Sequence, residues 1–438
     1  MVLQIRDPLH GFIEVTGSEQ RVLDSRPFQR LRHVQQLAMT SLVYPGATHR
    51  RFEHSLGVME LATRTFDVIT NQSHLTDKVR EVVPADRLDY WRQVVRVAAL
   101  MHDTGHLPFS HAAEGLLPNG SDHETLSELC ITSDEMKAVW TEMKLYPDDI
   151  VAVAVGPATR ATGDMAWIEI VKEIITGDAF GADRMDYLLR DSYHAGVAYG
   201  RFDHLRLIES LRILLPARAG GKDGQSAAPT LGITEGGIHA AEALLLARYF
   251  MFSQVYLQRT RRIYDVHLVD FLKAWLGEAG YSIDLEPHLA MTDNEVLSAI
   301  GEAARNPRLP GHVHARRITD RQHFRSVYTP TTEDLVRNAA GAKQLSEAIA
   351  ETFGAEHVRY SSERKAGFSG DFPVLRRDAK VVSSATASDV LGNIPAIVTH
   401  HVFVARELSD EIAAWVEANQ YEITAPRAEE DEDGEEAS

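Results

Sequence analysis

The sequence has 438 residues, of which 44% are apolar, so the chain is long enough for a large core or two domains. It contains no run of 18 apolar residues, which argues against a membrane span, and its first residues lack the charged-then-apolar order of a signal peptide. The single cysteine, Cys130, excludes an intrachain disulfide framework and a cysteine-based zinc site. Together these features indicate a cytoplasmic protein.

The formal net charge is −18, and seven of the carboxylates fall in the last ten residues. Such a block is typical of a disordered, solubilising tail, which we place at residues 421–438. An acidic chain is a poor candidate for generic nucleic-acid binding. An anionic substrate would therefore need local arginines or a metal ion to attract it against the overall field.

Helical patterns dominate the first 275 residues. A short hairpin is expected near the start (3–17), and helices are expected at 25–39, 53–72 and 88–103, with Gly105 as the cap of the last. Two further helical stretches follow, at 181–196 and from about 237 to 275, with a loop at 216–229 between them.

The pattern changes from about residue 280. Helical segments at 294–305, 332–353 and 409–420 alternate with strand-like segments at 379–388 and 395–405. We therefore predict a mainly α protein with a smaller α/β C-terminal appendage. The predicted units are a catalytic core (1–275), a regulatory or interface region (276–420) and the acidic tail.

The segment MHDTGHLPFSH (101–111) concentrates ionisable residues at a helix end. His102 and Asp103 could face one ion there, and His54 and Asp183 begin other helices that could converge on it. Imidazole nitrogen and carboxylate oxygen together are ligands for a first-row divalent metal. A single His-Asp pair is usually only a helix end, so it is the combination of these four residues that favours a metal site.

The motifs around these residues resemble a known family. DPLHGFIEV, FQRLRHVQQLAMTSLVYPGATHRRFEHSLGV, ALMHDTGHLPFSH and DRMDYLLRDSYHAGV are similar to the HD-domain metal-dependent phosphohydrolases, and more narrowly to the dNTP triphosphohydrolases of the SAM-and-HD-domain type. The resemblance covers residues 3–270, and no SAM domain is expected. It implies an HD-domain helical core, the metal ligands His54, His102, Asp103 and Asp183, and Mg²⁺, Mn²⁺ or Fe as the cofactor.

The resemblance also implies roles for catalytic and substrate-binding residues. His111 matches the general acid and His106 and His123 match its supporting histidines, while Glu114 stands where the family usually has Asp. The residues that match triphosphate, sugar and base contacts are Gln36, Leu37, Arg51, Arg184, Tyr187, Asp191, Arg248 and Tyr256. Arg184 replaces the Lys of many relatives, and Tyr256 follows Arg248 by eight residues, hence on the same helix face. His106 has an alternative interpretation as a hydrogen-bonded helix-end histidine, and Tyr256 as a core residue.

The expected reaction converts a dNTP and water into a deoxynucleoside and tripolyphosphate. In the resembling enzymes a guanine nucleotide binds between subunits, which implies an activator and a homo-oligomer, either a dimer or a tetramer. The matching residues are Asp24, Gln29, Arg32 and Arg206, whereas Leu3 and Arg6 depart from the family pattern. Asp24 could equally be the N-cap of a helix. The alternatives to this function are an HD phosphohydrolase that acts on another nucleotide and a non-catalytic nucleotide-sensing oligomer.

Overall fold

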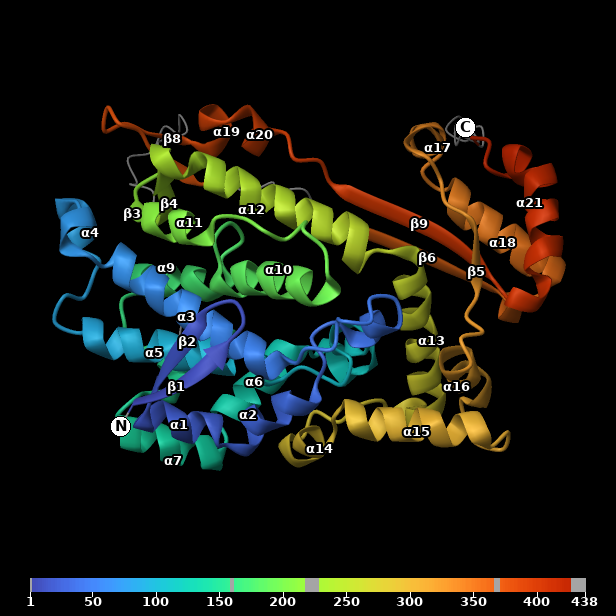
Figure 1. Ribbon diagram of the computed structural model, residues 1–438, viewed down its shortest axis with the longest axis horizontal. Coiled ribbons are helices and arrows are strands. Elements are labelled where there is room, and N and C mark those ends of the chain that lie inside the picture. The colour runs from blue at the N-terminus through green and yellow to red at the C-terminus, as the bar shows by residue number, and fades with distance from the viewer. Residues whose placement is uncertain (1, 158–160, 217–227, 366–370, 427–438) are drawn as a thin grey trace, which may run out of the picture.

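The protein is mainly helical, as predicted, and most of its helices pack into one N-terminal core (Figure 1). The computed structural model describes residues 2–157, 161–216, 228–365 and 371–426. The helices of this part are α1 (Gly17–Leu23), α2 (Arg26–Arg30), α3 (Arg51–Ile69), α4 (Asp77–Arg80), α5 (Leu88–Met101), α6 (His123–Ile131), α7 (Asp134–Met143), α8 (Pro147–Ala154), α9 (Met165–Thr176), α10 (Ala182–Ala195), α11 (His204–Ser210), α12 (Ile238–Met251) and α13 (Arg259–Leu276). None of the described helices is long and apolar enough to cross a lipid bilayer.

The chain starts with the predicted hairpin, in which β1 (Val2–Asp7) pairs antiparallel with β2 (Gly11–Thr16). The helix predicted at 25–39 is wrong beyond residue 33. There α2 is followed by a 3₁₀ turn (Leu31–His33), and a second one (Ala38–Leu42) begins after Gln35 has paired with Arg50 in an isolated β-bridge.

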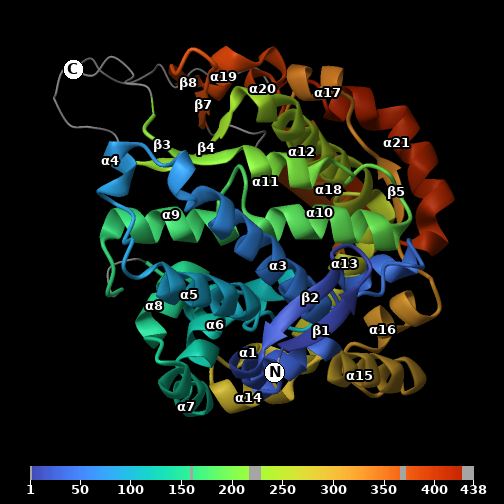
Figure 2. The same ribbon diagram turned by 60° about the vertical axis from the view of Figure 1, so that its left-hand side comes forward.

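Helix α3 runs through the core and packs against both α5 and α10 (Figure 2). Its approach to α10 depends on Gly57, where a Cβ atom would lie 1.9 Å from Asp186 Oδ1 and 2.5 Å from Arg190 Nη2. Most side chains of α3 are buried, including the polar side chains of His54 and Ser55. A buried polar side chain at the centre of a core needs hydrogen-bond partners, and α10 supplies them for His54 through Asp183 and Asp186.

The helical stretch predicted from about 237 to 275 is interrupted. After α12 the chain forms a π-helical turn (Phe252–Tyr256), and α13 begins at Arg259 with the side chain of Gln258 accepting from Arg261 N at 2.9 Å. The prediction that Arg248 and Tyr256 share one regular helix face is therefore wrong, since Tyr256 lies in the π-helical turn with its wider hydrogen-bond spacing.

Beyond residue 280 helices and strands alternate, as predicted. The helices are α14 (Leu285–Ala290), α15 (Asp293–Arg305), α16 (His312–Thr319), α17 (Thr332–Arg337), α18 (Gly341–Phe353), α19 (Ser384–Ala387), α20 (Asp389–Gly392) and α21 (Ser409–Ile423). The helix predicted at 332–353 is divided into α17 and α18. The strand predicted at 379–388 is limited to β8 (Val381–Ser383), because the Ser383 side chain accepts from Thr386 N and starts α19.

Two sheets organise the C-terminal half. One has the order β5 (Arg325–Tyr328), β9 (Ile397–Val404), β6 (Val358–Lys365), and α18 and α21 pack with it in a separate apolar cluster (Figure 1). The other has the order β3 (Leu211–Leu214), β4 (Thr230–Thr234), β7 (Pro373–Leu375), β8. Strand β7 is parallel to β4, with Ile233 opposite Val374. A sheet that begins before α12 is thus completed by residues near the end of the chain.

The division of the chain at residue 275 stays a prediction. Phe372, Val374 and Leu391 share a single hydrophobic core with residues of α3 and α5. Helix α21 extends to Ile423, and the acidic residues of the predicted tail from 427 on lie outside the described residues. The loop predicted at 216–229 also falls mostly outside them.

Candidate metal centre and substrate site

The four predicted metal ligands converge from three helices. His54 lies in the first turn of α3, His102 and Asp103 directly follow α5, and Asp183 lies in the first turn of α10. Asp183 Oδ1 is 3.0 Å from His54 Nε2 and 3.7 Å from His102 Nε2. Asp103 completes the group, with one carboxylate oxygen 3.5 Å from His54 Nε2 and the other 3.3 Å from His102 Nε2.

Each of the two imidazoles is held by its other nitrogen. His54 Nδ1 is hydrogen-bonded to Asp186 Oδ2 at 2.8 Å, and His102 Nδ1 donates to Ala99 O at 2.8 Å. Both Nε2 atoms therefore face the site, as in histidines that bind metal ions. His102 Nε2 is buried and has no hydrogen-bond partner among the described residues. Two imidazoles and two carboxylates so arranged fit a first-row divalent cation.

The same groups set the charge of the site. Although burial favours the neutral ring, the carboxylates of Asp183 and Asp186 raise the pKa of His54 to about 10. Burial acts against ionisation of Asp103, but the Arg51 guanidinium holds the pKa of that carboxyl well below its usual range. The carboxylates are thus ionised, and a cation bound between them would take the place of the proton on His54.

A buried network behind His54 was not predicted from the sequence. Asp186 accepts from Arg190 Nε at 2.8 Å and Nη2 at 2.9 Å, and Arg190 Nη1 donates to Asp7 Oδ2 at 2.9 Å. His10 Nε2 lies 2.7 Å from Asp186 Oδ1. The available signals were the Asp-Pro-Leu-His run at residues 7–10 and the four-residue spacing between Asp186 and Arg190 on one helix.

The turn after α5 is packed tightly against α6. The prediction that Gly105 caps α5 is wrong, because His102 already occupies the C-cap position. Gly105 is required by close approach instead: a Cβ atom there would lie 2.0 Å from His123 O and 2.2 Å from Ser127 N. Ser127 Oγ also accepts from Gly105 N and donates to His102 O. The turn that holds His102 and Asp103 is therefore attached to α6 through Ser127.

Three of the predicted catalytic residues adjoin the metal ligands. The rings of His106 and His123 are stacked, with centroids 4.0 Å apart, and Glu114 Oε1 is 2.6 Å from His123 Nδ1. His106 Nε2 lies 3.2 Å from Asp103 Oδ1. Burial lowers the pKa of His106 well below its ordinary value, whereas Glu114 outweighs burial and raises the pKa of His123. The side chain of His111 lies outside the described residues.

Arg51 is hydrogen-bonded to the turn that follows α5 and carries His106 and His111. Its Nε and Nη2 atoms donate to Ser110 Oγ at 3.0 and 2.7 Å, and its Nη1 donates to Asp103. The guanidinium therefore lies beside the predicted metal ligand Asp103.

Arg184 and Arg248 present unpaired donors. Arg184 Nη2 donates to Asp178 Oδ1 at 2.9 Å, but its Nε and Nη1 atoms are buried without a hydrogen-bond partner among the described residues. Arg248 Nε is also buried without a hydrogen-bond partner among the described residues. The Arg248 guanidinium lies 5.5 Å from the centre of the Phe252 ring. Buried donors of this kind need an acceptor from outside the chain or an ordered water.

Asp191 joins two elements at the predicted sugar site. It accepts from Tyr256 Oη at 2.6 Å, and His49 Nε2 lies 2.7 Å from its other oxygen. The Tyr187 ring lies 6.2 Å from the Tyr256 ring in an edge-to-face arrangement, and burial raises the pKa of Tyr187. His49 was not predicted, although it directly precedes the two arginines of the HRRFEH motif.

Gln36 and Leu37 follow the bridge between Gln35 and Arg50. Gln36 N donates to His49 O at 3.0 Å, and Gln36 Oε1 is buried without a partner among the described residues. The side chain of Leu37 is buried.

The four residues matched to an activator do not meet within one chain. Gln29 accepts from Arg32 Nε at 2.9 Å, and Asp24 is the C-cap of α1. The alternative that Asp24 is an N-cap is therefore wrong, since Ser25 is the N-cap residue of α2. Arg206 lies on α11, in the upper half of the molecule in Figure 1, whereas α1 and α2 lie at its lower edge.

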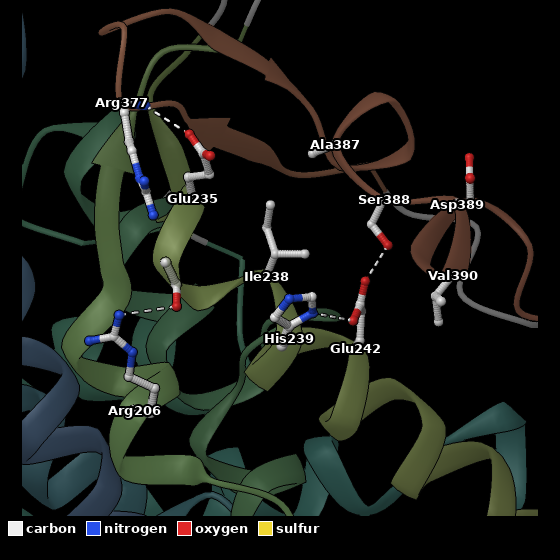
Figure 3. A pocket seen from close by; sticks show the side chains of 11 residues that line it. Arg206, Glu235, Ile238, His239, Glu242, Arg377, Ala387, Ser388, Asp389 and Val390 are labelled. Carbon is white, nitrogen blue, oxygen red and sulfur yellow. Dashed lines mark hydrogen bonds and ion pairs between the residues drawn. The ribbon is translucent and has the colours of Figure 1, made fainter.

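Arg206 lines a separate cavity of about 540 Å³ (Figure 3). The cavity lies between the start of α12 and the segment around α19 and α20. Arg206 donates to Gly236 O at 3.1 Å, and Glu242 accepts from Ser388 Oγ at 2.5 Å. The other lining residues are Glu235, Ile238, His239, Arg377, Ala387, Asp389 and Val390.

Another cluster of metal-ligating residue types, formed by His267, Asp270 and His314 away from these motifs, does not fit a cation. His267 Nε2 accepts from Phe324 N at 3.2 Å, so the proton of the neutral ring is on Nδ1. Asp270 is already paired with Arg359 Nε at 2.9 Å.

Comparison with known proteins places these motifs in a family. Residues 51–135 match the HD domain, and residues 202–360 match the HD-associated region. The uncharacterized protein MJ1154 of Methanocaldococcus jannaschii is 37% identical over 261 residues, which are 60% of this chain and 47% of that protein. The human deoxynucleoside triphosphate triphosphohydrolase SAMHD1 is 33% identical over 234 residues, or 48% of this chain and 36% of the relative. The chain thus spans about half of the first protein and about a third of the second.

A solved structure extends the likeness to nearly the whole chain. The crystal structure of a hypothetical protein from Aquifex aeolicus has 30% sequence identity and a TM-score of 0.76, and the match covers 94% of this chain and 99% of that one. Both the HD domain and the associated region are therefore present in one continuous fold. The chain belongs to the family of HD-domain proteins that carry an HD-associated region.

Proposed function

We propose that this protein is a metal-dependent dNTP triphosphohydrolase, which converts a dNTP and water into a deoxynucleoside and tripolyphosphate. The observation that carries the proposal is the convergence of His54, His102, Asp103 and Asp183 from three helices. A divalent cation bound there would polarise a phosphate and lower the pKa of a bound water. The similarity to the protein named deoxynucleoside triphosphate triphosphohydrolase SAMHD1 supports the choice of substrate.

Our assignment of the triphosphate contacts rests on the unpaired arginine donors. The free nitrogens of Arg184 and Arg248 are suited to phosphate oxygens, because a guanidinium offers a planar set of donors to them. Arg51, fixed on Ser110 and Asp103, would add positive charge next to the metal. These cations offset the acidity of the chain as a whole.

The proton would move through the histidines beside the metal. Water adds to the α-phosphorus, the bond from phosphorus to the 5′ oxygen breaks, and this oxygen takes up a proton. We assign that proton to His111, with His106, His123 and Glu114 as the groups that hold or resupply it. The opposite pKa shifts of the stacked His106 and His123 suit two groups with different proton affinities.

The sugar would lie against Tyr187, Asp191 and Tyr256, with Gln36 and Leu37 beneath it. Asp191 keeps a fixed position because it is bonded to Tyr256 and His49. Close packing by the buried Leu37 favours deoxyribose, since a 2′-hydroxyl would need space that it fills.

We also propose that the active form is a homo-oligomer bound to a guanine nucleotide. The support is that α11, which carries Arg206, lies far from α2, which carries Gln29 and precedes Arg32, so that one nucleotide could touch all three only between two copies of the chain (Figure 1). Light scattering with and without GTP tests this: an increase in mass with the nucleotide is expected, and an unchanged monomer would contradict it.

Product analysis tests the function. Purified protein is incubated with each dNTP and with Mg²⁺, Mn²⁺ or Fe²⁺, and the products are separated by anion exchange. We expect deoxynucleoside and tripolyphosphate in equal amounts, with Asp103→Asn as an inactive control. Diphosphate products, or no products with every metal, would overturn the proposal.

The same experiment separates the two alternatives. Hydrolysis of other nucleotides in place of dNTPs would indicate an HD phosphohydrolase of different specificity. Binding of nucleotides without hydrolysis, measured by calorimetry, would indicate a nucleotide-sensing oligomer.

A further inference from the structure

A carboxylate from the HD-associated region joins two loops of the catalytic site. Asp293 is the first residue of α15 and is 1% exposed. Its Oδ2 accepts from Gln35 N at 2.8 Å, and its Oδ1 accepts from Phe109 N at 2.9 Å. These two amides are 74 residues apart in the sequence, and in the described structure each of them donates to this one side chain.

Both amides belong to segments that carry proposed site residues. Gln35 directly precedes Gln36 and Leu37. Phe109 begins the turn toward His111 and has a φ of +59°, in the left-handed region that a bulky residue rarely adopts. Such a conformation persists only where neighbouring groups hold it in place, and Asp293 is bonded to the amide at this point.

The two segments also meet each other directly. Ser110 Oγ lies 3.4 Å from Gln35 O and accepts two bonds from Arg51. Arg51 in turn contacts Asp103. The contacts from Asp293 therefore reach the metal ligands through Ser110 and Arg51.

The side chain of Asp293 is not needed to start its own helix. Thr292 and Glu295 form a capping box at the N-terminus of α15, with Glu295 Oε2 accepting from Thr292 N at 2.8 Å. The nearest guanidinium nitrogen, Arg50 Nη1, is 4.0 Å from Asp293 Oδ2. The helix is already capped and the ion pair is long, so the short hydrogen bonds of this buried carboxylate are those with the two loop amides.

We propose that Asp293 is a positioning residue of the catalytic site: its carboxylate fixes the distance between the Gln35–Leu37 segment and the Phe109–Ser110 turn. The consequence for catalysis rests on the proposed function. The HD-associated region then has a defined task, which is to hold the loop of the predicted general acid in register with the substrate-binding loop.

Asp293→Asn tests the proposal with little change in shape. The side-chain amide of Asn has one oxygen acceptor and one nitrogen donor. Only one of the two backbone N–H groups, of Gln35 or of Phe109, therefore keeps an acceptor. Because a displacement of about 1 Å can cost about 100-fold in rate, we expect kcat to fall between about 10-fold and 100-fold while bound metal stays at the wild-type level. Asp293→Glu should recover part of the loss.

Glu295→Ala is the matched control. It removes the capping box of the same helix and leaves both bonds to Asp293, so the melting temperature should fall while kcat stays within about twofold of wild type. Equal losses of kcat in the Glu295 and Asp293 variants would show that only the stability of α15 matters and would overturn the proposal.

Hydrogen exchange gives a readout that needs no activity. In Asp293→Asn the amides of residues 33–37 and 107–111 should exchange faster than in wild type, and in Glu295→Ala they should not. Unchanged exchange in these two segments would overturn the proposal, whether or not the wild-type protein hydrolyses dNTPs. Faster exchange together with an inactive wild-type protein would support the positioning role and contradict only the proposed function.

Discussion

His54 and Asp186 are joined by a 2.8 Å hydrogen bond between Nδ1 of the imidazole and Oδ2 of the carboxylate. The bond crosses from α3 to α10 and fixes which nitrogen of His54 faces the metal site. Asp186 is itself held by Arg190 and His10, and its pKa lies well below the usual range because these cationic and hydrogen-bonding groups outweigh burial. The orientation of one predicted metal ligand therefore depends on a buried ion pair behind it.

Asp186→Asn should weaken metal binding. The amide removes the negative charge that supports His54, and loss of such a partner lowers metal affinity by about 10-fold to 100-fold. Competition with a chelator of known affinity measures this change. Asp67 lies on the same helix as His54 and forms an exposed ion pair with Arg92 of α5. Asp67→Asn breaks this pair and should leave metal affinity unchanged. Equal affinities for wild type and Asp186→Asn would contradict the role of the bond.

Arg96→Ala should strongly destabilise the fold. Arg96 Nε lies 2.5 Å from Glu19 Oε1, both side chains are buried, and Arg96 Nη1 also donates to Thr63 Oγ1. Removal of one partner leaves a buried charge unpaired, which costs about 3–5 kcal/mol. The free energy of unfolding in urea measures the loss.

Arg92→Ala, one turn earlier on α5, is the control for this variant. Its pair with Asp67 is substantially exposed, and exposed ion pairs contribute about 0–1 kcal/mol. A similar loss in both variants would mean that burial of the Arg96 pair has no special importance.

Gly57→Ala should disturb the metal centre through the backbone of α3. The added Cβ would lie within 2.5 Å of side-chain atoms of Asp186 and Arg190, so these groups must move away from His54. We expect a lower melting temperature and weaker metal binding. Gly115→Ala is the control, because a Cβ atom there meets nothing within 4 Å. Retention of wild-type metal affinity in Gly57→Ala would contradict this prediction, because α10 would then be able to move away from α3 without changing the metal site.

His288 should make the fold sensitive to acid. Burial, together with the nearby Arg30, lowers the pKa of His288 from 6.5 to about 3, and its Nε2 lies 3.1 Å from Thr104 O. Between these two pH values the unfolded chain binds a proton that the folded chain does not. The contribution of His288 to stability is therefore present above pH 6.5 and is lost as the pH falls toward 3.

His288→Gln tests this dependence. The free energy of unfolding, measured in urea with a chelator present, should fall less steeply between pH 7 and pH 5 than in wild type. His239→Gln, at a side chain that is 95% exposed, should keep the wild-type slope. An unchanged slope in His288→Gln would contradict the assignment.

The sequence predicted those parts of the site that depend on local pattern and motif. The hairpin and the mainly α core follow from patterns of neighbouring residues, and the four predicted metal ligands, which the fold brings together, follow from recognisable motifs. The sequence did not reveal Asp186, His49 or Asp293, because each acts through a partner that the fold brings from more than 100 positions away.

The errors have a common physical cause. At Gln35 the bridge with Arg50 replaces the predicted helix, and at Tyr256 the π-helical turn accompanies a hydrogen bond from Tyr256 to Asp191 of α10. Gly105 looked like a helix cap, but it is small because α6 packs on it. In each case the deciding contact is with another element rather than with the next residues of the chain.

The parallel pairing of β4 with β7 has a consequence for synthesis of the protein. When the ribosome has completed α13, β4 is paired with β3 on one side only, and the edge that will receive β7 is open. The residues that cover this edge, Pro373–Leu375, are translated about a hundred residues later. If the N-terminal part folds early, the β4 edge stays exposed during that time. Completion of the sheet therefore has to wait for residues 373–383, and a nascent chain that stalls before this point is exposed to aggregation through β4.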